Sequence, residues 1–161
     1  MSELLITSSL DSIEEGQVFS KNLPRHVTIW QYFELPDLYI DTFIADASDA
    51  ITGFPPLQIE GSDYAELGPE HNVPVRRVRA LGSGATLITL HTVLGTIIER
   101  YEGTVKNPEW AYQGYNPHIT YVDGRALGEG ERAVLRTVEL IEKNPISREK
   151  IVRNVWKLEE A

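Results

Sequence analysis

Two short segments of the sequence share one arrangement, a histidine and a threonine separated by a single aliphatic residue. His26 and Thr28 form the first segment, and His118 and Thr120 form the second, with the histidines 92 positions apart (118 minus 26). Side chains two residues apart on a strand project from the same face, about 6.5–7 Å apart along the chain. Each segment in a strand would therefore present an imidazole and a hydroxyl together.

Two such strands, brought together, would offer two imidazoles and two hydroxyls to one cleft, a set that suits phosphodiester cleavage. A neutral imidazole can take a proton from the attacking water or hydroxyl, while an imidazolium donates one to the leaving oxygen. The threonine hydroxyls can bind the non-bridging phosphate oxygens and hold the phosphorus in line. Because the imidazolium offsets the charge that develops on phosphate, the sequence predicts chemistry without a metal or other cofactor.

A single His-x-Thr segment is weak evidence, because both residue types occur in strands without any catalytic role. Two copies with an aliphatic centre arise by chance in roughly one sequence per thousand at ordinary residue usage. The surroundings repeat as well, since Pro24 precedes the first histidine by two positions and Pro117 precedes the second by one. We therefore interpret the paired segments as a functional site.

The hydrophobic pattern places both segments in strands of an α+β domain. Runs rich in apolar and β-branched residues predict strands at 3–10, 26–33, 57–60, 73–80, 118–122 and, although its spacing would also suit a helix, 150–158. Apolar residues at helical spacing predict helices at 37–50, 85–101 and 131–143. Loops are expected at 17–24 and 102–117, and a turn at 82–84.

The order of these elements repeats in outline around the two histidines. Each histidine opens a strand preceded by a proline, and a helix, a proline and another strand follow. The repeat is degenerate, and its period is too long for a solenoid. We expect one domain over residues 1–161, built from two similar lobes that face each other.

The composition limits the class of ligand. The chain of 161 residues carries 24 acidic and 15 basic side chains, for a net charge of −9, and it has no cysteine for disulfides or thiolate metal sites. Proteins that grip long nucleic acids usually rely on many basic contacts to phosphate, so we expect a small nucleotide partner instead. No apolar run approaches the ~18 residues of a membrane span, and no signal peptide is apparent, so a cytoplasmic location is expected.

The paired motifs, the chain length and the strand–helix order resemble the two-histidine (2H) phosphoesterase superfamily, the LigT-like or 2'-5' RNA ligase family. The resemblance implies a bilobal, pseudo-symmetric α+β fold, with two antiparallel sheets forming a central cleft and helices outside. It also implies that His26 and His118 are the acid/base pair, and that Thr28 and Thr120 hold the phosphate. Members hydrolyse 2',3'-cyclic phosphates, ADP-ribose cyclic phosphate, RNA ends or 2'-5' linkages, and a viral branch degrades cyclic oligonucleotide messengers of immunity such as cGAMP.

The sequence departs from the family pattern just after the second motif. Many members place a basic residue two or three positions beyond it, where this chain has Val122 and Asp123, and the nearest arginine is Arg125. The chain is also at the short end for the family, so a loop that covers an RNA terminus could be missing.

Aromatic residues near each motif are candidates for binding a base. Trp30 and Tyr32 continue the face of the first motif, where they could stack on a nucleobase or pack at the edge of the cleft. The loop before the second motif could clamp a base or be anchored by hydrophobic packing, through Trp110, Tyr112 and Tyr115.

Arg77 is the candidate for binding a second phosphate, because it shares a strand face with the arginine two positions later. A solvated strand face is the simpler interpretation of this pair. Arg25 adjoins the first motif but should point away from its histidine. His71 and His91 have no partner at ligand spacing, so structural or exposed positions are expected for both.

Together these features predict a metal-independent phosphodiesterase that acts on a small cyclic or 2'-5'/3'-5' linked nucleotide. The candidate substrates are a cyclic oligonucleotide, which would make the protein of the anti-CBASS type, and a 2',3'-cyclic phosphate. One alternative is a non-catalytic nucleotide-binding module that sequesters its ligand. Another is RNA-end processing or 2'-5' RNA ligation, which the lack of a basic tract disfavours.

Overall fold

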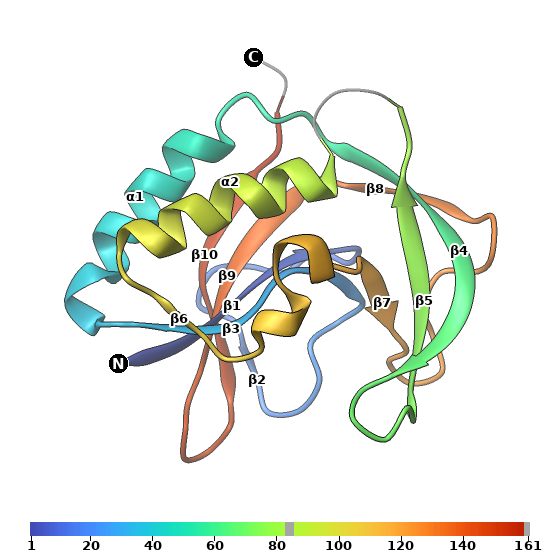
Figure 1. Cartoon of the computed structure of the whole chain (residues 1–161), viewed down its shortest axis with the longest axis horizontal. Helices are drawn as coiled ribbons and strands as arrows, with labels where there is room; N and C mark the ends of the chain where they lie inside the picture. The colour runs from blue at the N-terminus through green and yellow to red at the C-terminus, as the bar shows by residue number, and fades with distance from the viewer. Residues whose placement is uncertain (83–85, 160–161) are drawn as a thin grey trace.

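Apolar and β-branched runs dominate the chain, and they build one curled antiparallel sheet (Figure 1). The computed structural model describes residues 1–82 and 86–159. These residues form ten strands: β1 (Ser2–Ser9), β2 (Val18–Phe19), β3 (His26–Leu35), β4 (Leu57–Leu67), β5 (Val73–Ala80), β6 (Thr104–Val105), β7 (His118–Thr120), β8 (Arg132–Leu135), β9 (Thr137–Lys143) and β10 (Lys150–Lys157). The described helices are α1 (Ile40–Ile51), α2 (Leu87–Arg100) and the short 3-10 helices η1 (Asp37–Tyr39), η2 (Pro108–Trp110) and η3 (Tyr112–Gly114).

The strand order shows two lobes joined at the motif strands. Across the sheet the order is β2-β10-β9-β1-β3-β7-β5-β4-β8, and β6 pairs with β3 off this path. The halves meet between β3 and β7, where Val27 pairs with Ile119. The α+β class and the two-lobed arrangement are confirmed. The prediction of two separate sheets is wrong. Strands β3 and β7 pair with each other, so the two halves form one continuous sheet.

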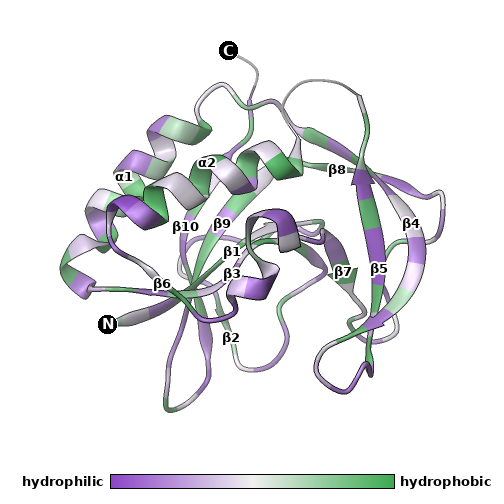
Figure 2. Cartoon of the chain, in the orientation of Figure 1, coloured by the Kyte–Doolittle hydropathy of each residue, from purple (hydrophilic) through white to green (hydrophobic). Residues whose placement is uncertain are grey.

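Helices α1 and α2 lie side by side and cover one face of the sheet (Figure 1). Phe43 and Ala47 of α1 and Leu90 and Leu94 of α2 are fully buried in the same core as Phe33 of β3. Their three- and four-residue spacing gives each helix one apolar side. Figure 2 shows the resulting mixture of hydrophobic and hydrophilic residues around both helices. The core therefore lies between the helices and one side of the sheet.

The helix predicted at 131–143 is wrong, because these residues form β8 and β9. Leu135 and Val138 are three positions apart, which mimics helical spacing, but they belong to different strands. Strand β8 pairs with β4, whereas β9 pairs with β1 and β10. Residues 138–141 are all buried, as expected for an interior strand covered on both faces. A run of consecutive buried residues has no period that distinguishes a strand from a helix.

The strand predicted at 73–80 is found with the same boundaries as β5, and the other predicted elements are found with changed boundaries. The strand predicted at 57–60 extends to Leu67, and the closing segment is strand β10. The loop at 17–24 contains β2, and the loop at 102–117 contains β6, η2 and η3. Part of the predicted turn and the first residue of the predicted second helix fall at 83–85, outside the described residues.

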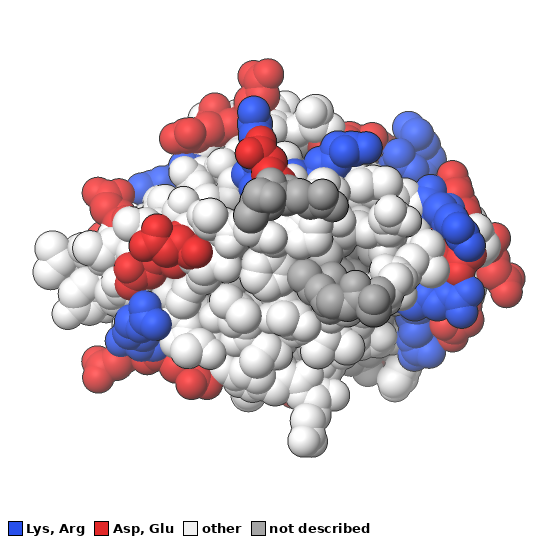
Figure 3. Space-filling model, turned by 90° about the horizontal axis from the view of Figure 1, so that it is seen from above, with Lys and Arg blue, Asp and Glu red and all other residues white. Residues whose placement is uncertain are grey.

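Charged side chains of both signs are interspersed around the edge of the face seen in Figure 3, and much of its middle is uncharged. Opposite charges also pair between elements, as between Arg100 of α2 and Asp46 of α1, whose side chains approach to 3.2 Å. Neither α-helix in the described part of the chain is long and apolar enough to cross a membrane.

Candidate active site

The two motifs meet at the junction between the lobes. Val27 and Ile119, the central residues of the motifs, pair in antiparallel register. This pairing brings His26 opposite Thr120 and Thr28 opposite His118. Those central aliphatic residues are fully buried in the core under the helices. Because successive side chains of a strand alternate between faces, the four polar side chains project from the other face of the sheet. The arrangement has a local two-fold symmetry that mirrors the repeat in the sequence.

All four motif side chains line one cavity of about 240 Å³. Its walls come from β3 and β7 with the residues just after β7, and from parts of β1, β10 and the loop before β3. Besides His26, Thr28, His118 and Thr120, its walls contain Leu5, Asn22, Leu23, Gln31, Tyr32, Tyr121, Val122 and Lys150. The structure thus brings together the four residues that the sequence singled out.

The two histidines are held in the same way. Nδ1 of His26 lies 2.8 Å from the carbonyl oxygen of Pro24, and Nδ1 of His118 lies 2.6 Å from that of Asn116. A carbonyl oxygen can only accept, so Nδ1 carries the proton and donates in both cases. In the neutral imidazole, Nε2 is then the unprotonated nitrogen, free to accept a proton from a ligand. Each ring is therefore oriented by the backbone two residues before it.

Burial lowers the pKa of both histidines below their ordinary value. For His26, the Pro24 carbonyl opposes this effect, and positive charges on His118 and Lys150 lower the pKa further. For His118, the Asn116 carbonyl opposes it, and the charge on Arg77 adds to the lowering. The neutral form that a general base requires is thus favoured at both positions. The effect of His118 on the pKa of His26 is consistent with their positions on adjacent strands.

Arg77 lies beside the cavity rather than in its wall. It pairs in register with His118 across β5 and β7, which accounts for its effect on that histidine. Its guanidinium donates to Asp63 Oδ2 at 3.0 Å, while its Nε is buried without a partner among the described residues. The arginine two positions later, Arg79, donates instead to Glu60. The two arginines were expected to share a solvated strand face, and each forms an ion pair there. Of the two, Arg77 is the one that adjoins the site.

The prediction that Trp30 stacks on a base is wrong. Its side chain is only 2% exposed and belongs to the main core. The register of β1 against β3 shifts twice near this point, so β3 is bulged and Ile29 and Trp30 are both buried. The indole stacks on the ring of His91 at 4.1 Å and donates from Nε1 to the His91 carbonyl at 2.7 Å. Tyr32, beyond the bulge, does line the cavity.

Tyr112 and Tyr115 anchor their loop instead of clamping a base. Tyr115 stacks on His91 at 4.1 Å and donates its hydroxyl to the Thr28 carbonyl at 2.9 Å. Tyr112 donates its hydroxyl to Glu99 and its backbone N–H to His91 Nε2. Neither ring lines the cavity. The alternative of loop anchoring is therefore the correct one for both residues, and His91 has a structural role.

Trp110 is the aromatic residue of this loop that approaches the site. The centre of its ring lies 6.1 Å from that of His118, at a tilt of 57°. It does not line the cavity itself. A role for Trp110 or Tyr32 in holding a base stays a prediction.

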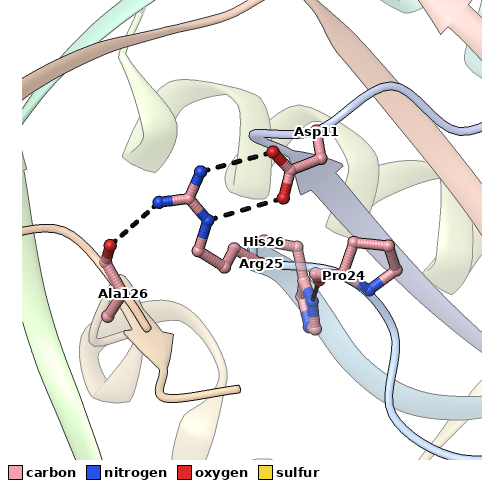
Figure 4. Close-up of polar contacts among 5 residues, drawn as sticks. All are labelled: Asp11, Pro24, Arg25, His26 and Ala126. Carbon is pink, nitrogen blue, oxygen red and sulfur yellow. Dashed lines mark hydrogen bonds and ion pairs between the residues drawn. The ribbon is translucent and has the colours of Figure 1, made fainter. Parts of the chain in front are cut away.

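Arg25 connects the loops that precede and follow the two motifs (Figure 4). Its guanidinium donates to Ala126 O at 3.0 Å and forms two longer contacts with Asp11, at 3.3 and 3.4 Å. Figure 4 shows the side chain extending away from the His26 ring, as expected from the alternation of the strand. Arg25 is thus a structural tie between segments on either side of the site.

Several wall residues were not predicted from the sequence. Gln31 and Tyr121 are close to the motifs along the chain, so proximity in sequence could have indicated them. Lys150 has no such signal, because it reaches the cavity only through the pairing of β10 with β9. A larger hollow of about 420 Å³ lies between α1 and α2, lined by Asp46, Asp49, Ala50, Val93, Thr96, Ile97 and Arg100. It holds no histidine and lies away from both motifs.

Solved structures share this fold. No protein-family model and no curated protein sequence matches the chain. E. coli LigT complexed with 3'-AMP aligns with a TM-score of 0.66 and 15% identity, over 98% of this chain and 98% of LigT. The protein TT0787 of Thermus thermophilus aligns with a TM-score of 0.64 and 15% identity, over 99% of each chain. A further structure, of a phosphoesterase, gives 0.66 and 14% over 99% of each chain.

E. coli LigT has also been solved in complex with NADP+ and with ATP, and both structures align with a TM-score of 0.64. The alignments extend over nearly the whole of each chain, so they include both lobes and the junction where the motifs meet. The resemblance inferred from the paired motifs is confirmed at the level of the fold. This chain has the same fold as E. coli LigT and TT0787.

Proposed function

We propose that this single two-lobed domain is a metal-independent phosphodiesterase that hydrolyses a small nucleotide with a cyclic or 2'-5'/3'-5' linkage. The observation that carries the proposal is the presence of both His-x-Thr motifs in the wall of one cavity. The backbone bonds to Nδ1 leave each Nε2 free for proton transfer. The nucleotide complexes of E. coli LigT, which has the same fold, support a nucleotide as the ligand.

In the proposed reaction, the neutral histidine accepts a proton from water at Nε2 as the water oxygen bonds to phosphorus. The bond from phosphorus to the leaving oxygen breaks, and the protonated histidine donates its Nε2 proton to that oxygen. Thr28 and Thr120 donate hydrogen bonds to the non-bridging oxygens and hold the phosphate between the two rings. The two histidines then exchange protons with water, which restores the starting state.

The size of the cavity favours a small substrate. At about 240 Å³ it lies below the ~300–1,000 Å³ range of sites that enclose a drug-sized ligand. It suits the reacting phosphate and adjoining sugar, with the rest of the ligand outside. The net charge of −9 adds no general attraction for long nucleic acid. Both cyclic oligonucleotides and 2',3'-cyclic phosphates meet these conditions.

The test is incubation of EDTA-treated protein with a panel of 2',3'-cyclic mononucleotides, 2'-5' oligoadenylate, and cyclic di- and trinucleotides that include both cGAMP isomers. Chromatography identifies the products, with the double variant His26→Ala/His118→Ala as the control. Cleavage by the wild type alone supports the proposal, and the member cleaved identifies the linkage. A requirement for added divalent metal would contradict it. Tight binding of a member without cleavage would favour the sequestering module instead.

The pH profile of kcat/KM should be bell-shaped, with its optimum below the ordinary histidine pKa of about 6.5. The reaction needs one histidine neutral and the other protonated. Activity therefore falls as pH drops through the pKa of the base and as it rises through that of the acid. Because the pKa of both histidines is lowered, both limbs move toward acid pH. Steady-state kinetics between pH 4.5 and about 8.5 would measure this.

The variant Arg77→Met should identify which limb of the pH profile reflects the titration of His118. Removal of this positive charge should raise the pKa of His118, so one limb moves toward higher pH. Movement of the acidic limb assigns His118 as the base, and movement of the basic limb assigns it as the acid. Arg79→Met is the matched control on the same strand, since Arg79 bonds to Glu60. An Arg77→Met profile that coincides with that of the wild type would contradict this account of the site.

Replacing Thr28 or Thr120 by valine should lower kcat/KM about 10–100-fold, because a hydrogen bond to a charged group contributes about 1.5–3 kcal/mol. Valine keeps the shape of threonine and removes only the hydroxyl. Kinetics on the cleaved member of the panel would measure the loss. Thr96→Val is the control, since Thr96 is exposed on α2 and bonds only to the Thr92 carbonyl. Unchanged kcat/KM in both motif variants would argue against a phosphate-binding role.

A further inference from the structure

A second feature of the site is a lysine in the cavity wall, on β10, that is paired with another lysine on β9. Lys150 lines the cavity, and Lys143 lies directly opposite it in the register of β9 and β10. Like charges in such a cross-strand pair repel and destabilise the sheet. The pair is therefore unfavourable for the sheet by itself. In a chain with a net charge of −9, two paired cations beside the candidate active site require an explanation.

The carboxylates around this lysine pair neutralise it only in part. Lys143 Nζ lies 3.8 Å from Glu3 Oε1, but the same carboxylate oxygen also pairs with Lys106 at 3.2 Å. Lys150 Nζ donates to the Lys21 carbonyl at 3.1 Å, and no ion pair among the described residues includes it. Arg148, in the hairpin between the two strands, adds a third positive charge. Burial lowers the pKa of Lys150, and the positive charges of Lys143 and Arg148 lower it further.

The aromatic ring of Tyr32 links the lysine pair to the motif wall. Lys143 Nζ lies 4.8 Å above the centre of this ring, and Tyr32 lines the same cavity as His26 and Lys150. His26 and Lys150 line the same cavity, so one ligand can contact both. The cavity is too small for a whole dinucleotide. A ligand that extends from the histidines toward β10 would place its next anionic group near Lys150.

We propose that Lys150, with the positive charge of Lys143 behind it, binds a second phosphate group of the substrate, next to the one that reacts. The favoured substrate is then a nucleotide with at least two phosphates rather than a simple nucleoside cyclic phosphate. This inference rests on the proposed function, because it takes the reacting phosphate to lie between His26 and His118. The second group can be a terminal phosphate monoester or the next phosphodiester of an oligonucleotide, since both present anionic oxygens to an ammonium group.

The test is calorimetric binding of three ligands that need no turnover. Adenosine 3'-monophosphate carries one phosphate, adenosine 3',5'-bisphosphate adds a terminal monoester, and the dinucleotide ApAp adds an internal diester. At low salt the wild type should bind at least one of the last two about tenfold more tightly than the monophosphate. The preferred ligand distinguishes a terminal phosphate from an oligonucleotide. The preference should weaken as the salt concentration rises.

Lys150→Met should reduce this preference to near unity, because it keeps the apolar length of the side chain and removes the charge. Lys157→Met, at the exposed far end of the same strand, is the matched control and should keep the preference. A wild type that shows no preference, or a Lys150→Met variant that retains it, would overturn the inference. The panel assay tests hydrolysis separately. Lys150-dependent preference without hydrolysis would refute only the proposed enzyme, and hydrolysis without preference would refute only the second phosphate site.

Discussion

Replacing His26 or His118 by alanine is expected to lower kcat by about 10²–10⁴-fold, the usual contribution of a positioned general acid or base. Each ring has its Nδ1 bonded to a backbone carbonyl, so Nε2 is the atom that meets the ligand. No other histidine among the described residues lines the cavity to take over the proton transfer. The two rings act in one step. The kcat of the double variant should therefore be only slightly lower than that of the less active single variant. Single-turnover kinetics on the cleaved substrate would measure the chemical step directly.

These variants should remain folded, because both rings are only half-buried and their polar partners are local carbonyls. Thermal unfolding followed by circular dichroism would verify this, with His71→Asn as the control for loss of a histidine. His71 is exposed and has a left-handed backbone, with a φ of 52°, which asparagine tolerates. Added imidazole should partly restore the alanine variants if the lost group is a proton carrier. Wild-type turnover by the folded double variant would refute the proposed mechanism.

The part of the site that could be predicted from sequence is the part that depends on local geometry. His26 and Thr28 share a face because a strand alternates, and the same holds for His118 and Thr120. The repeat of the motif indicates in addition that the two strands meet. The antiparallel register around Val27 joins them as that repeat suggests.

The errors occur where neighbours in space override the local pattern. The sequence spacing of Trp30 continues the alternation of the motif, which predicts that it shares the face of His26. The bulge of β3 against β1 instead places its side chain in the core. That bulge depends on two strands distant in sequence, so no window around Trp30 reveals it. The helix expected at 131–143 is wrong for a related reason. The apolar run of this segment is divided between two strands whose partners lie elsewhere in the chain.

Lys150 shows that local sequence patterns also fail to predict some functional residues. It is 32 positions beyond His118 (150 minus 118), in a segment whose sequence predicts only a closing strand. Its place in the cavity follows from the return of β10 beside β9 and from the position of β9 next to β1. Such an order is a property of the whole sheet. Local patterns can therefore identify the acid/base groups of this fold more readily than the groups that select the rest of the substrate.

His91→Ala should destabilise the protein by about 3–5 kcal/mol, through a cavity and two buried backbone groups left unpaired. The His91 ring is 1% exposed and is stacked between Trp30 and Tyr115, at 4.1 Å from each. Its Nδ1 donates to the Ile29 carbonyl at 2.6 Å, and its Nε2 accepts the Tyr112 N–H at 2.9 Å. One neutral tautomer thus ties β3 and α2 to the loop before the second motif. Urea unfolding at pH 7.5 would measure the loss.

The pH dependence of this loss separates the neutral imidazole from simple packing. Burial lowers the pKa of His91, and the Ile29 carbonyl opposes this only in part. The stabilisation by neutral His91 is therefore complete above the histidine pKa of the unfolded protein, about 6.5. It is lost as pH falls from there through the lower pKa of the folded protein, by at most about 1.4 kcal/mol per pH unit. His26 and His118 titrate in the same direction in both proteins, so their contributions cancel in the comparison. The difference in unfolding free energy between wild type and His91→Ala should shrink from pH 7.5 to pH 5. A difference that stays constant would mean that His91 contributes packing alone, because a charged imidazole could not accept the Tyr112 N–H.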